Sequence, residues 1–277
     1  MPTQSDPGKQ QCSLLLFLAV PAEEKGLKEA VKARGLPFER IKKKDSLLGE
    51  DYFWLGPVGN EAAVIAMRPA RSDDDDLPVM GSIGFLGTAA RGMRLKMATG
   101  AQAIVQLGMA FGIDAEIQKP GDVLVSTSII PYDNRDIKPA PDGREGYVTE
   151  YSQVSREPAR PALVELFRRE QRRGGHHFGV YRGAMLSGAA RIHCSFFRDE
   201  LVRSVPAGED PIIGGEMEGV GLLAASSTAD DPIWCIVKGV SDFADENRDA
   251  VYVANRPIAC RNAAEFVLSA LTNDVAG

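Results

Sequence analysis

The sequence predicts an α/β fold, in which one domain has a central twisted sheet, mostly parallel but mixed, between two layers of helices. Apolar segments of strand length alternate with amphipathic segments of helix length along the chain. Several apolar segments end in glycine or acidic residues, as strands do where an α/β sheet carries its site. No internal repeat or linker divides the 277 residues. We therefore expect one three-layer αβα domain over residues 13–277, after a disordered tail over residues 1–12.

The composition of the chain argues against several classes of protein. Hydrophobic residues make up 44% and charged residues 25%, which is ordinary for a globular domain. The net charge of −6 makes nucleic acid or an anionic membrane an unfavourable partner. No apolar run is long enough to span a bilayer, and residues 14–20 lack the flanks of a signal peptide. These features predict a cytoplasmic protein without a nucleic-acid or membrane partner.

The spacing of cysteines and histidines indicates neither disulfides nor a metal site. The four cysteines lie far apart in the sequence: Cys12, Cys194, Cys235 and Cys260. Because two of them sit in apolar runs, we expect reduced, buried thiols. The chain has three histidines, His176, His177 and His193. They form no metal-ligand spacing with acids or cysteines, so we predict no metal and no cofactor.

The first half of the chain begins with a predicted central strand, because residues 13–20 form a continuous apolar run. Pro21 then favours the first turn of a helix over residues 22–34, which Gly35 ends. Glu23 lies in that first turn, where it either complements the helix dipole or serves a site at the end of the strand. Further strands are predicted at residues 38–44, 52–58 and 61–67.

Two segments between residues 68 and 98 match binding motifs only weakly. Four consecutive aspartates at residues 73–76 suggest a cation site, but such runs are mostly solvated loops, and we favour the loop. Gly81, Gly84 and Gly87 open a predicted helix that runs to about residue 98. They lack the spacing and the preceding strand of a dinucleotide-binding loop.

The second half of the chain continues the alternation of strands and helices. Residues 103–107 form a short predicted strand that ends in a turn, 108–112, where a ligand could approach backbone amides. Residues 136–156 are polar and rich in proline and glycine, so we interpret them as a flexible excursion that could act as a lid. Further strands are expected at residues 121–130 and 178–186, and helices at residues 158–173, 196–204 and 257–271.

Acidic residues follow two apolar segments that we expect to be neighbouring strands. Glu216 and Glu218 end the first segment, and Ser241 and Asp242 follow the second, at residues 234–240. The carboxyl ends of such strands meet at one edge, so the carboxylates should lie close together. Two glutamates cannot both be buried and charged without partners, so we assign function to Glu218 and a supporting role to Glu216.

Six short segments, in the same order, resemble the purine nucleoside phosphorylase superfamily. They are residues 19–23 (AVPAE), 107–113 (LGMAFGI), 119–126 (KPGDVLVS), 187–188 (SG), 216–219 (EMEG) and 237–242 (VKGVSD). Each alone is a modest signal, but six in one order are specific and span most of residues 13–271. The chain is most similar to the 5′-methylthioadenosine/S-adenosylhomocysteine nucleosidase branch. Residues 129–135 and 197–201 resemble nucleosidase-like domains of bacterial defence proteins.

The resemblance implies roles for particular positions. Asp242 matches the acid that protonates N7 of the purine, and Glu23 matches the carboxylate that activates the attacking water. Glu218 matches the residue that holds the ribose hydroxyls, Met217 packs under the ribose, and Ser241 supports Asp242. Breaking an N-glycosidic bond requires such roles, because the base leaves with a proton from an oxocarbenium-like sugar. Further substrate contacts are implied for Gly108, Met109, Ala110, Phe111, Arg135, Arg191, Ile192, Glu216 and Lys238.

These residues indicate a purine nucleosidase that hydrolyses an adenine nucleoside or nucleotide, such as methylthioadenosine, S-adenosylhomocysteine, AMP or ATP. Phosphorylases of the superfamily carry a phosphate-binding arginine where this chain has Glu23, which favours hydrolysis. The alternatives are a phosphate-dependent phosphorylase and a nucleotide-binding sensor with little catalysis. The resemblance also implies a homodimer or a larger homo-oligomer.

Three positions depart from the nucleosidase pattern. Lys238 replaces an arginine that makes a bidentate contact, and Met109 replaces a serine or threonine near the sugar. Arg191 replaces an aromatic residue that stacks on the base. These changes make a phosphorylated substrate plausible, with Arg135, Arg191 or Arg91 as candidate phosphate contacts; the alternative for each arginine is a surface residue.

Overall fold

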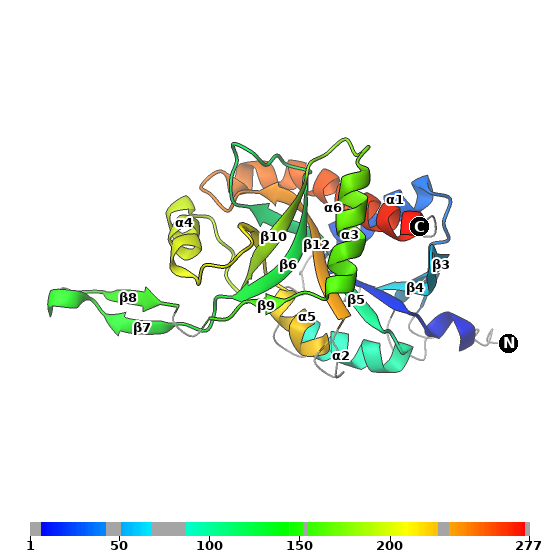
Figure 1. Cartoon of the computed structure of the whole chain (residues 1–277), viewed down its shortest axis with the longest axis horizontal. Coiled ribbons are helices and arrows are strands. Elements are labelled where there is room, and N and C mark those ends of the chain that lie inside the picture. Colours follow the sequence, from blue (N-terminus) through cyan, green and yellow to red (C-terminus); the bar gives the residue numbers. More distant parts are fainter. Residues whose placement is uncertain are drawn as a thin grey trace.

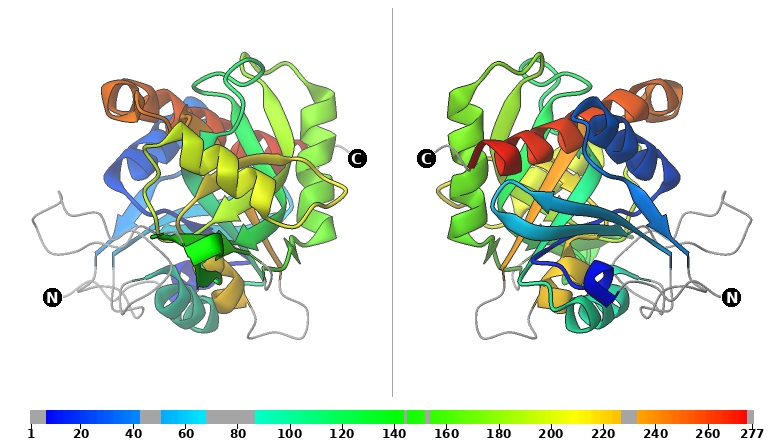
Figure 2. Two further views of the ribbon diagram at one scale, coloured as in Figure 1. Left: turned by 90° about the vertical axis from the view of Figure 1, so that its left-hand side faces the viewer. Right: turned by 90° about the vertical axis from the view of Figure 1, so that its right-hand side faces the viewer.

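The computed structural model describes residues 7–42, 51–67, 87–143, 145–151, 154–226 and 233–274. One central sheet carries helices on both faces, as the sequence predicts (Figure 1). One face is covered by α1 (Pro21–Ala33), α3 (Pro161–Arg173) and α6 (Arg248–Asn273). The opposite face is covered by α2 (Thr88–Thr99) and α5 (Gly219–Ser226), so the domain has three layers (Figure 2).

Within the described residues, the main sheet has ten strands. Their order in the described part of the chain is β11-β10-β6-β12-β5-β1-β4-β3-β2, with β9 beside β6. Their bounds are β1 (Leu14–Phe17), β2 (Glu39–Ile41), β3 (Tyr52–Val58), β4 (Glu61–Met67), β5 (Ala103–Gly112), β6 (Val123–Pro131), β9 (Glu157–Pro158), β10 (Val180–Ser187), β11 (Ile212–Glu216) and β12 (Ile233–Asp242).

Parallel and antiparallel pairs both occur in this sheet. β1 pairs in parallel with β4 and β5, β12 pairs in parallel with β5, and β10 pairs in parallel with β6 and β11. Antiparallel pairs join β2 to β3, β3 to β4, β12 to β6 and β9 to β6. Every residue of β1 is buried, which agrees with its continuous apolar sequence. Because β1, β5 and β12 are parallel, their carboxyl ends meet at one edge.

The pairing of β5 with β11 corrects two predictions from the sequence. β5 remains a strand through residues 108–112, which were expected to form a turn, and it pairs antiparallel with β11. β11 and β12 are therefore not hydrogen-bonded to each other; each instead borders β5. Glycine permits the contact, because a Cβ on Gly215 would lie 2.2 Å from the ring of Phe111.

The apolar faces of α1 and α6 form the core over one face of the sheet. Leu27 and Val31 of α1 are buried, on the face that the sequence predicts. The two helices approach closely at Gly26, where an added Cβ would lie 2.7 Å from the backbone carbonyl carbon of Cys260. This packing fixes the first turn of α1 at the end of β1.

α6 begins at Arg248, well before the helix start predicted at residue 257. Pro257 lies inside the helix, although proline in a helix interior removes one backbone hydrogen bond. The helix continues because the residues beyond the proline, from Ala259 onward, are largely buried in the core. The first turns of α6, before Ala259, contribute no buried residue to the core.

The segment expected to be a flexible excursion forms a hairpin of β7 (Asp136–Pro139) and β8 (Tyr147–Glu150), with the short helix η3 (Pro141–Gly143) between them. The hairpin projects from the body of the protein, at the end where α4 (Ser195–Ser204) also lies (Figure 1). Its residues Ile137 and Tyr147 are exposed.

The N-terminal part of the described chain is also structured. Pro7–Gln10 forms the short helix η1, and Gln10 and Cys12 are buried, so regular structure begins before residue 13. The aspartate run at residues 73–76 and the predicted loop glycines Gly81 and Gly84 lie outside the described residues.

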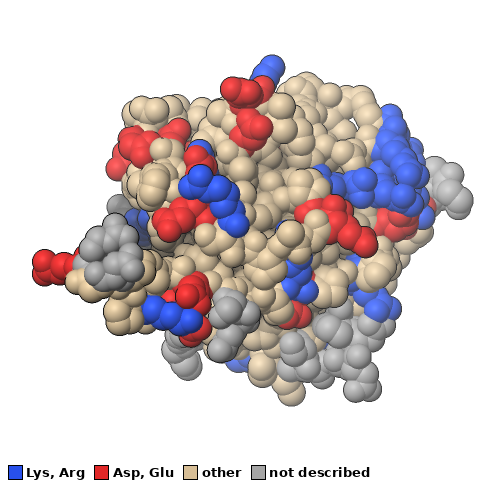
Figure 3. Space-filling model, turned by 60° about the vertical axis from the view of Figure 1, so that its left-hand side comes forward, with Lys and Arg blue, Asp and Glu red and all other residues tan. Residues whose placement is uncertain are grey.

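The surface of the described chain carries mixed charge. On the face shown in Figure 3, acidic and basic side chains are interspersed among other residues, and several basic side chains cluster at the right-hand edge. No described helix is long and apolar enough to cross a membrane. All four cysteines are free, and only Cys194 is exposed.

Candidate active site

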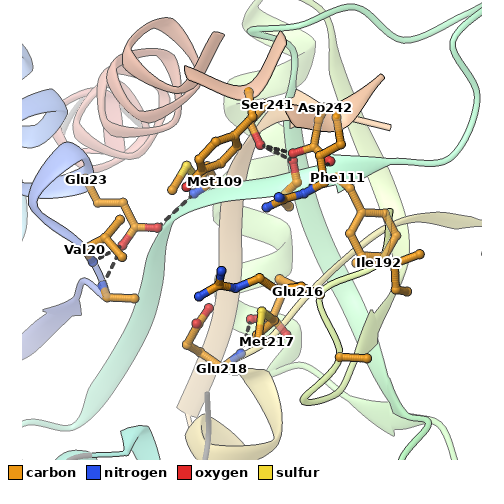
Figure 4. Close-up of a pocket in the computed structure, with 17 residues that line it drawn as sticks. Val20, Glu23, Met109, Phe111, Ile192, Glu216, Met217, Glu218, Ser241 and Asp242 are labelled. Atoms are coloured by element: carbon orange, nitrogen blue, oxygen red, sulfur yellow. Dashed lines mark hydrogen bonds and ion pairs between the residues drawn. The ribbon is translucent and has the colours of Figure 1, made fainter. Parts of the chain in front are cut away.

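A pocket opens at the edge where β1, β5, β11 and β12 end (Figure 4). The empty space within it, counted together with the solvent at its open mouth, is about 570 Å³. Most of the residues singled out in the sequence line it: Glu23, Met109, Ala110, Phe111, Arg191, Ile192, Glu216, Met217, Glu218, Ser241 and Asp242. Gly108 and Lys238 lie behind these residues, in contact with the glutamates. Arg135 is exposed and does not line the pocket.

Glu23 is fixed by the segment that leads from β1 into α1. Its Oε2 accepts hydrogen bonds from the backbone N–H groups of Ala19 (2.5 Å) and Val20 (3.2 Å). Its Oε1 accepts one from the backbone N–H of Met109 on β5 (3.1 Å). The third position of a helix lets a glutamate fold back over the N-terminal turn in this way. Backbone groups of two elements therefore hold both carboxylate oxygens.

β5 passes directly under this carboxylate at Gly108. A Cβ at that position would lie 1.8 Å from Glu23 Oε1, so the contact requires glycine. Burial raises the pKa of Glu23 to about 7, with Lys238 acting to lower it and Glu218 to raise it. A carboxyl group with this pKa exchanges protons readily at neutral pH.

Glu216 shapes the turn between β11 and α5. Its carboxylate accepts hydrogen bonds from the backbone N–H groups of Glu218 (2.8 Å) and Gly219 (2.9 Å). These N–H groups open α5, and the negative charge complements the positive end of the helix dipole. Ser187 Oγ accepts a further hydrogen bond from the N–H of Val220 (3.1 Å). Glu216 thus fixes the backbone that carries Glu218.

Lys238 ends between the two glutamates of this turn. Its Nζ lies 2.6 Å from Glu218 Oε2 and 3.2 Å from Glu216 Oε2. Burial opposes the charge of Lys238, but the surrounding carboxylates, Glu218 foremost, raise its pKa above the usual value. The sequence predicted that two buried glutamates need partners, and Lys238 is the cation that they share. It binds these carboxylates and does not itself line the pocket.

Asp242 ends β12 on another side of the pocket (Figure 4). Its Oδ2 accepts a hydrogen bond from the Ser241 hydroxyl (2.7 Å), and its Oδ1 accepts one from the backbone N–H of Ala244 (3.0 Å). Arg248 Nε lies 3.4 Å from the same Oδ1. The turn after β12 is tight, since Ala244 has a φ of 51°, which is uncommon for a residue with a side chain.

Apolar side chains form the walls between the carboxylates. The larger ones are Met109, Phe111, Ile192 and Met217. The loop at residues 190–192 forms one wall, and the hydroxyl of the buried Tyr132 donates a hydrogen bond to the Ala190 carbonyl (3.3 Å). Apolar walls with a few fixed polar groups suit a small organic ligand.

Arg248 and Tyr252 also line the pocket, although sequence reasoning did not single them out. Both extend from the first turns of α6. The guanidinium carbon of Arg248 lies 4.6 Å from the centre of the Tyr252 ring, and that of Arg256 lies 5.7 Å from it. Positions i, i+4 and i+8 share one face of a helix. This spacing was a usable signal, but the predicted helix began at residue 257, after all three residues.

The other candidate phosphate contacts lie in different surroundings. Arg191 is exposed and lines the pocket. Arg91 is 2% exposed on α2, where its Nη2 lies 3.8 Å from Met67 Sδ, and it does not line the pocket. Within the described ranges, no group of three histidine, cysteine, aspartate or glutamate side chains could hold a metal ion.

Comparison with known proteins identifies the family. The model of the phosphorylase superfamily matches residues 14–272. A curated relative, a death domain-containing ATP nucleosidase from Amphimedon queenslandica, is 28% identical over 193 residues, which are 62% of this chain and 34% of the relative. The chain thus spans about a third of the length of that relative.

Solved structures show the same fold. The 5′-methylthioadenosine/S-adenosylhomocysteine nucleosidase from Neisseria meningitidis, in complex with methylthio-immucillin-A, has a TM-score of 0.69 and 19% identity, covering 94% of this chain and 98% of that one. The futalosine hydrolase of Helicobacter pylori has a TM-score of 0.67 and 18% identity, covering 93% and 96%. The match of the family model to almost the whole described domain, together with this fold, shows that the chain belongs to the phosphorylase superfamily.

Proposed function

We propose that this protein is a purine nucleosidase, which hydrolyses the N-glycosidic bond of an adenine nucleoside or nucleotide and releases the free base. The observation that carries the proposal is a pair of buried carboxylates on different sides of one pocket, Glu23 with a pKa of about 7 and Asp242 (Figure 4). The similar proteins include an ATP nucleosidase, a methylthioadenosine/S-adenosylhomocysteine nucleosidase and a futalosine hydrolase, which supports the same class of reaction.

Glu23 is the base that activates water. Backbone N–H groups on both of its oxygens keep the carboxylate in one orientation. A base with a pKa of about 7 is ionised in a large fraction of molecules at neutral pH and still accepts a proton readily. Water held by Glu23 therefore becomes a better nucleophile as it attacks the sugar.

Asp242 is the acid that protonates the leaving purine at N7. Protonation lets the base leave as a neutral molecule, which lowers the barrier to breaking the bond. The Ser241 hydroxyl and the Ala244 N–H orient the Asp242 carboxyl group. The apolar rings and side chains of the walls exclude water from the base.

Glu218 binds the ribose. A carboxylate accepts hydrogen bonds from sugar hydroxyls, and its negative charge stabilises the positive charge that develops on the ring. Lys238 holds one oxygen of Glu218 at 2.6 Å, so the carboxylate is positioned before the ligand arrives. Met217, which also lines the pocket, packs against the apolar face of the sugar.

The charge at the first turn of α1 favours hydrolysis over phosphorolysis. A helix N-terminus is a natural site for an anion. Here the carboxylate of Glu23 already accepts the N–H groups of Ala19 and Val20 that a phosphate ion would need. A phosphate ion would also meet this buried negative charge at close range.

Chromatography of the free base tests the proposal. The protein is incubated with methylthioadenosine, adenosine, AMP and ATP in phosphate-free buffer, and again with phosphate added. We expect adenine from at least one substrate without phosphate. Release that requires phosphate would instead show a phosphorylase. Tight nucleotide binding without release from any substrate would show a nucleotide sensor.

We also propose that the protein acts in the cytoplasm as a homodimer or a larger homo-oligomer, as its family resemblance implies. Exposed apolar side chains on the β7–β8 hairpin and on α4, such as Tyr147 and Phe196, offer surface for such contacts. Size-exclusion chromatography with light scattering measures the number of copies. A single copy throughout the micromolar range would contradict the homo-oligomer.

A further inference from the structure

The charged groups of the pocket differ between its inner part and its mouth. In the inner part, Lys238 and backbone N–H groups compensate the buried glutamates. Two arginines, Arg191 and Arg248, are the cationic side chains that the described chain contributes to the pocket lining. A ligand with an anionic group would use them, whereas the base and sugar of a neutral nucleoside carry no charge for them to bind.

Arg248 is held in the pocket by several neighbours. Its Nε lies 3.4 Å from Asp242 Oδ1, and its Nη1 lies 3.3 Å from His193 Nε2 and 3.6 Å from Asp249 Oδ1. Its guanidinium stacks on the ring of Tyr252. Its side chain is only 17% exposed, so the charge is partly shielded from water. Such stacking preorganises an arginine for a planar, bidentate contact with an oxyanion.

The position of Arg248 beside Asp242 indicates which part of a ligand it meets. This step rests on the proposed function, in which Asp242 protonates N7. When the base of a purine nucleoside is anti, the imidazole edge that carries N7 and C8 lies on the same side as the 5′ carbon. A guanidinium has donors on more than one edge. Arg248 can therefore keep Nε beside Asp242 while a terminal nitrogen binds a group on the 5′ carbon.

We propose that Arg248, with Arg191 at the rim, binds the 5′-phosphate of a purine nucleotide, and that the pocket thereby selects nucleotides over nucleosides. Arginine forms strong, charge-assisted hydrogen bonds with phosphate oxygens. Of the arginines suggested by the sequence, Arg135 and Arg91 are outside the pocket lining. The phosphate site is instead built by the first turn of α6, together with the loop that carries Arg191.

Steady-state kinetics of adenine release from AMP and from adenosine test this selection. The measured quantity is the ratio of kcat/KM for AMP to kcat/KM for adenosine. We expect Arg248→Gln to lower this ratio by about 10- to 100-fold, the loss expected for charge-assisted hydrogen bonds. Arg248→Lys keeps the positive charge but loses the planar, forked guanidinium. Its ratio should therefore lie between that of wild type and that of Arg248→Gln. Arg191→Gln should lower the ratio less, because Arg191 is exposed.

Arg135→Gln is the matched control, since it removes an exposed arginine outside the pocket lining. It should leave the ratio at the wild-type value. Because Arg248 also contacts Asp242, its loss can slow both substrates equally, and the ratio removes that common effect. An unchanged ratio in Arg248→Gln would overturn the proposal, and so would a wild-type preference for adenosine over AMP.

Two further measurements separate this inference from the proposed function. Titration calorimetry compares AMP with adenosine in wild type and in Arg248→Gln, and it needs no turnover. Tighter binding of AMP that depends on Arg248 would support the phosphate site even if no adenine were released. Inorganic phosphate presents the same oxyanion as a 5′-phosphate, so it could bind Arg248 instead. Phosphate that accelerates cleavage of adenosine in wild type but not in Arg248→Gln would assign the arginine to free phosphate, against our proposal.

Discussion

Two sides of the pocket are held in place by different means. On the Glu23 side, backbone N–H groups bind both oxygens of the carboxylate, and β5 lies so close to it that a Cβ on Gly108 would clash with Oε1. On the Asp242 side, the carboxylate contacts groups of its own turn and one long side chain, Arg248 of α6. The contacts of the Glu23 carboxylate cannot change without moving α1 or β5. On the Asp242 side, the backbone holds one contact, from Ala244, whereas the contacts of Ser241 and Arg248 are made by side chains that can rotate.

This difference indicates how the reaction is organised. A base that activates water gains most from being fixed before the substrate binds, because reorganisation at the moment of reaction is costly. The part of the pocket that meets the base and the 5′ group benefits from side chains that can adjust to the ligand. We therefore expect mutations on the two sides to differ in their effects on kcat, KM and stability.

The largest expected effect is that of Asp242→Asn. An amide of nearly the same shape keeps a side chain in this position but cannot deliver a proton to N7. We expect kcat to fall by about 100- to 10,000-fold, the contribution of a positioned general acid. Adenine release measures the loss, and circular dichroism checks the fold. If the variant kept a folded structure and most of its activity, another group would have to be the acid.

Glu23→Gln is the corresponding change on the Glu23 side of the pocket, which we call the rigid side. It removes the base, so we expect a loss of about 100-fold or more in kcat. In wild type, activity should rise as pH increases through about 7, because Glu23 must lose its proton to accept one from water. The residual activity of Glu23→Gln should lack this rise. The same pH profile in both proteins would assign the rise to a different group.

The raised pKa of Glu23 also predicts a pH dependence of stability. With a pKa of about 7 in the folded protein and an ordinary value of 4.5, Glu23 binds more protons in the folded state between these values. Its contribution is fully present below the lower value and is lost as pH rises through 7. The loss is at most about 3 kcal/mol. Urea unfolding at pH 5 and pH 8 should show a smaller difference in Glu23→Gln than in wild type.

Lys238→Met tests the buried charges behind the rigid side. It leaves Glu216 and Glu218 buried without their shared cation, which should lower the unfolding free energy by about 3–5 kcal/mol. Because Lys238 lowers the pKa of Glu23, the rise in activity should also move to higher pH. Lys238→Arg keeps the charge and is the control. Unchanged urea unfolding in Lys238→Met would contradict the shared-cation role.

The sequence predicted best those elements whose signals are local. β3 and β4 have the predicted bounds, and the apolar face of α1 is the predicted one, because period and burial agree within each segment. The first turns of α6 were missed because none of residues 248–258 is buried, so no apolar period marks them. The pairing of β11 with β5 joins segments that are distant in the sequence. Its one local signal is the pair of glycines in β11, which allow the close approach of β5.

In the pocket, too, features with a local sequence signal were predicted, and features that depend on contacts between distant segments were not. The three carboxylates of Glu23, Glu218 and Asp242 could be named because each follows an apolar strand within a short motif, and the structure brings them to one pocket. Ser241 was named as the support of Asp242, and the structure pairs the two side chains. The contacts that other elements make with these carboxylates were not predicted. Lys238 reaches two glutamates across the sheet, and Arg248 reaches Asp242 from a helix whose start was misplaced. Both contacts depend on packing between elements, which local sequence does not encode.

The smallest expected effect concerns the adjustable wall at residues 190–192. Tyr132→Phe removes the hydroxyl that donates to the Ala190 carbonyl but keeps the ring. The ring packs closely against Gly188, where an added Cβ would lie 2.4 Å from it. Losing this one hydrogen bond should raise KM by about two- to fivefold. We expect kcat to stay unchanged, because the Tyr132 hydroxyl donates its hydrogen bond to Ala190 and not to Glu23 or Asp242. A fall in kcat as large as the rise in KM would mean that this wall also positions the reacting groups, and the distinction between a rigid side and an adjustable side would then fail.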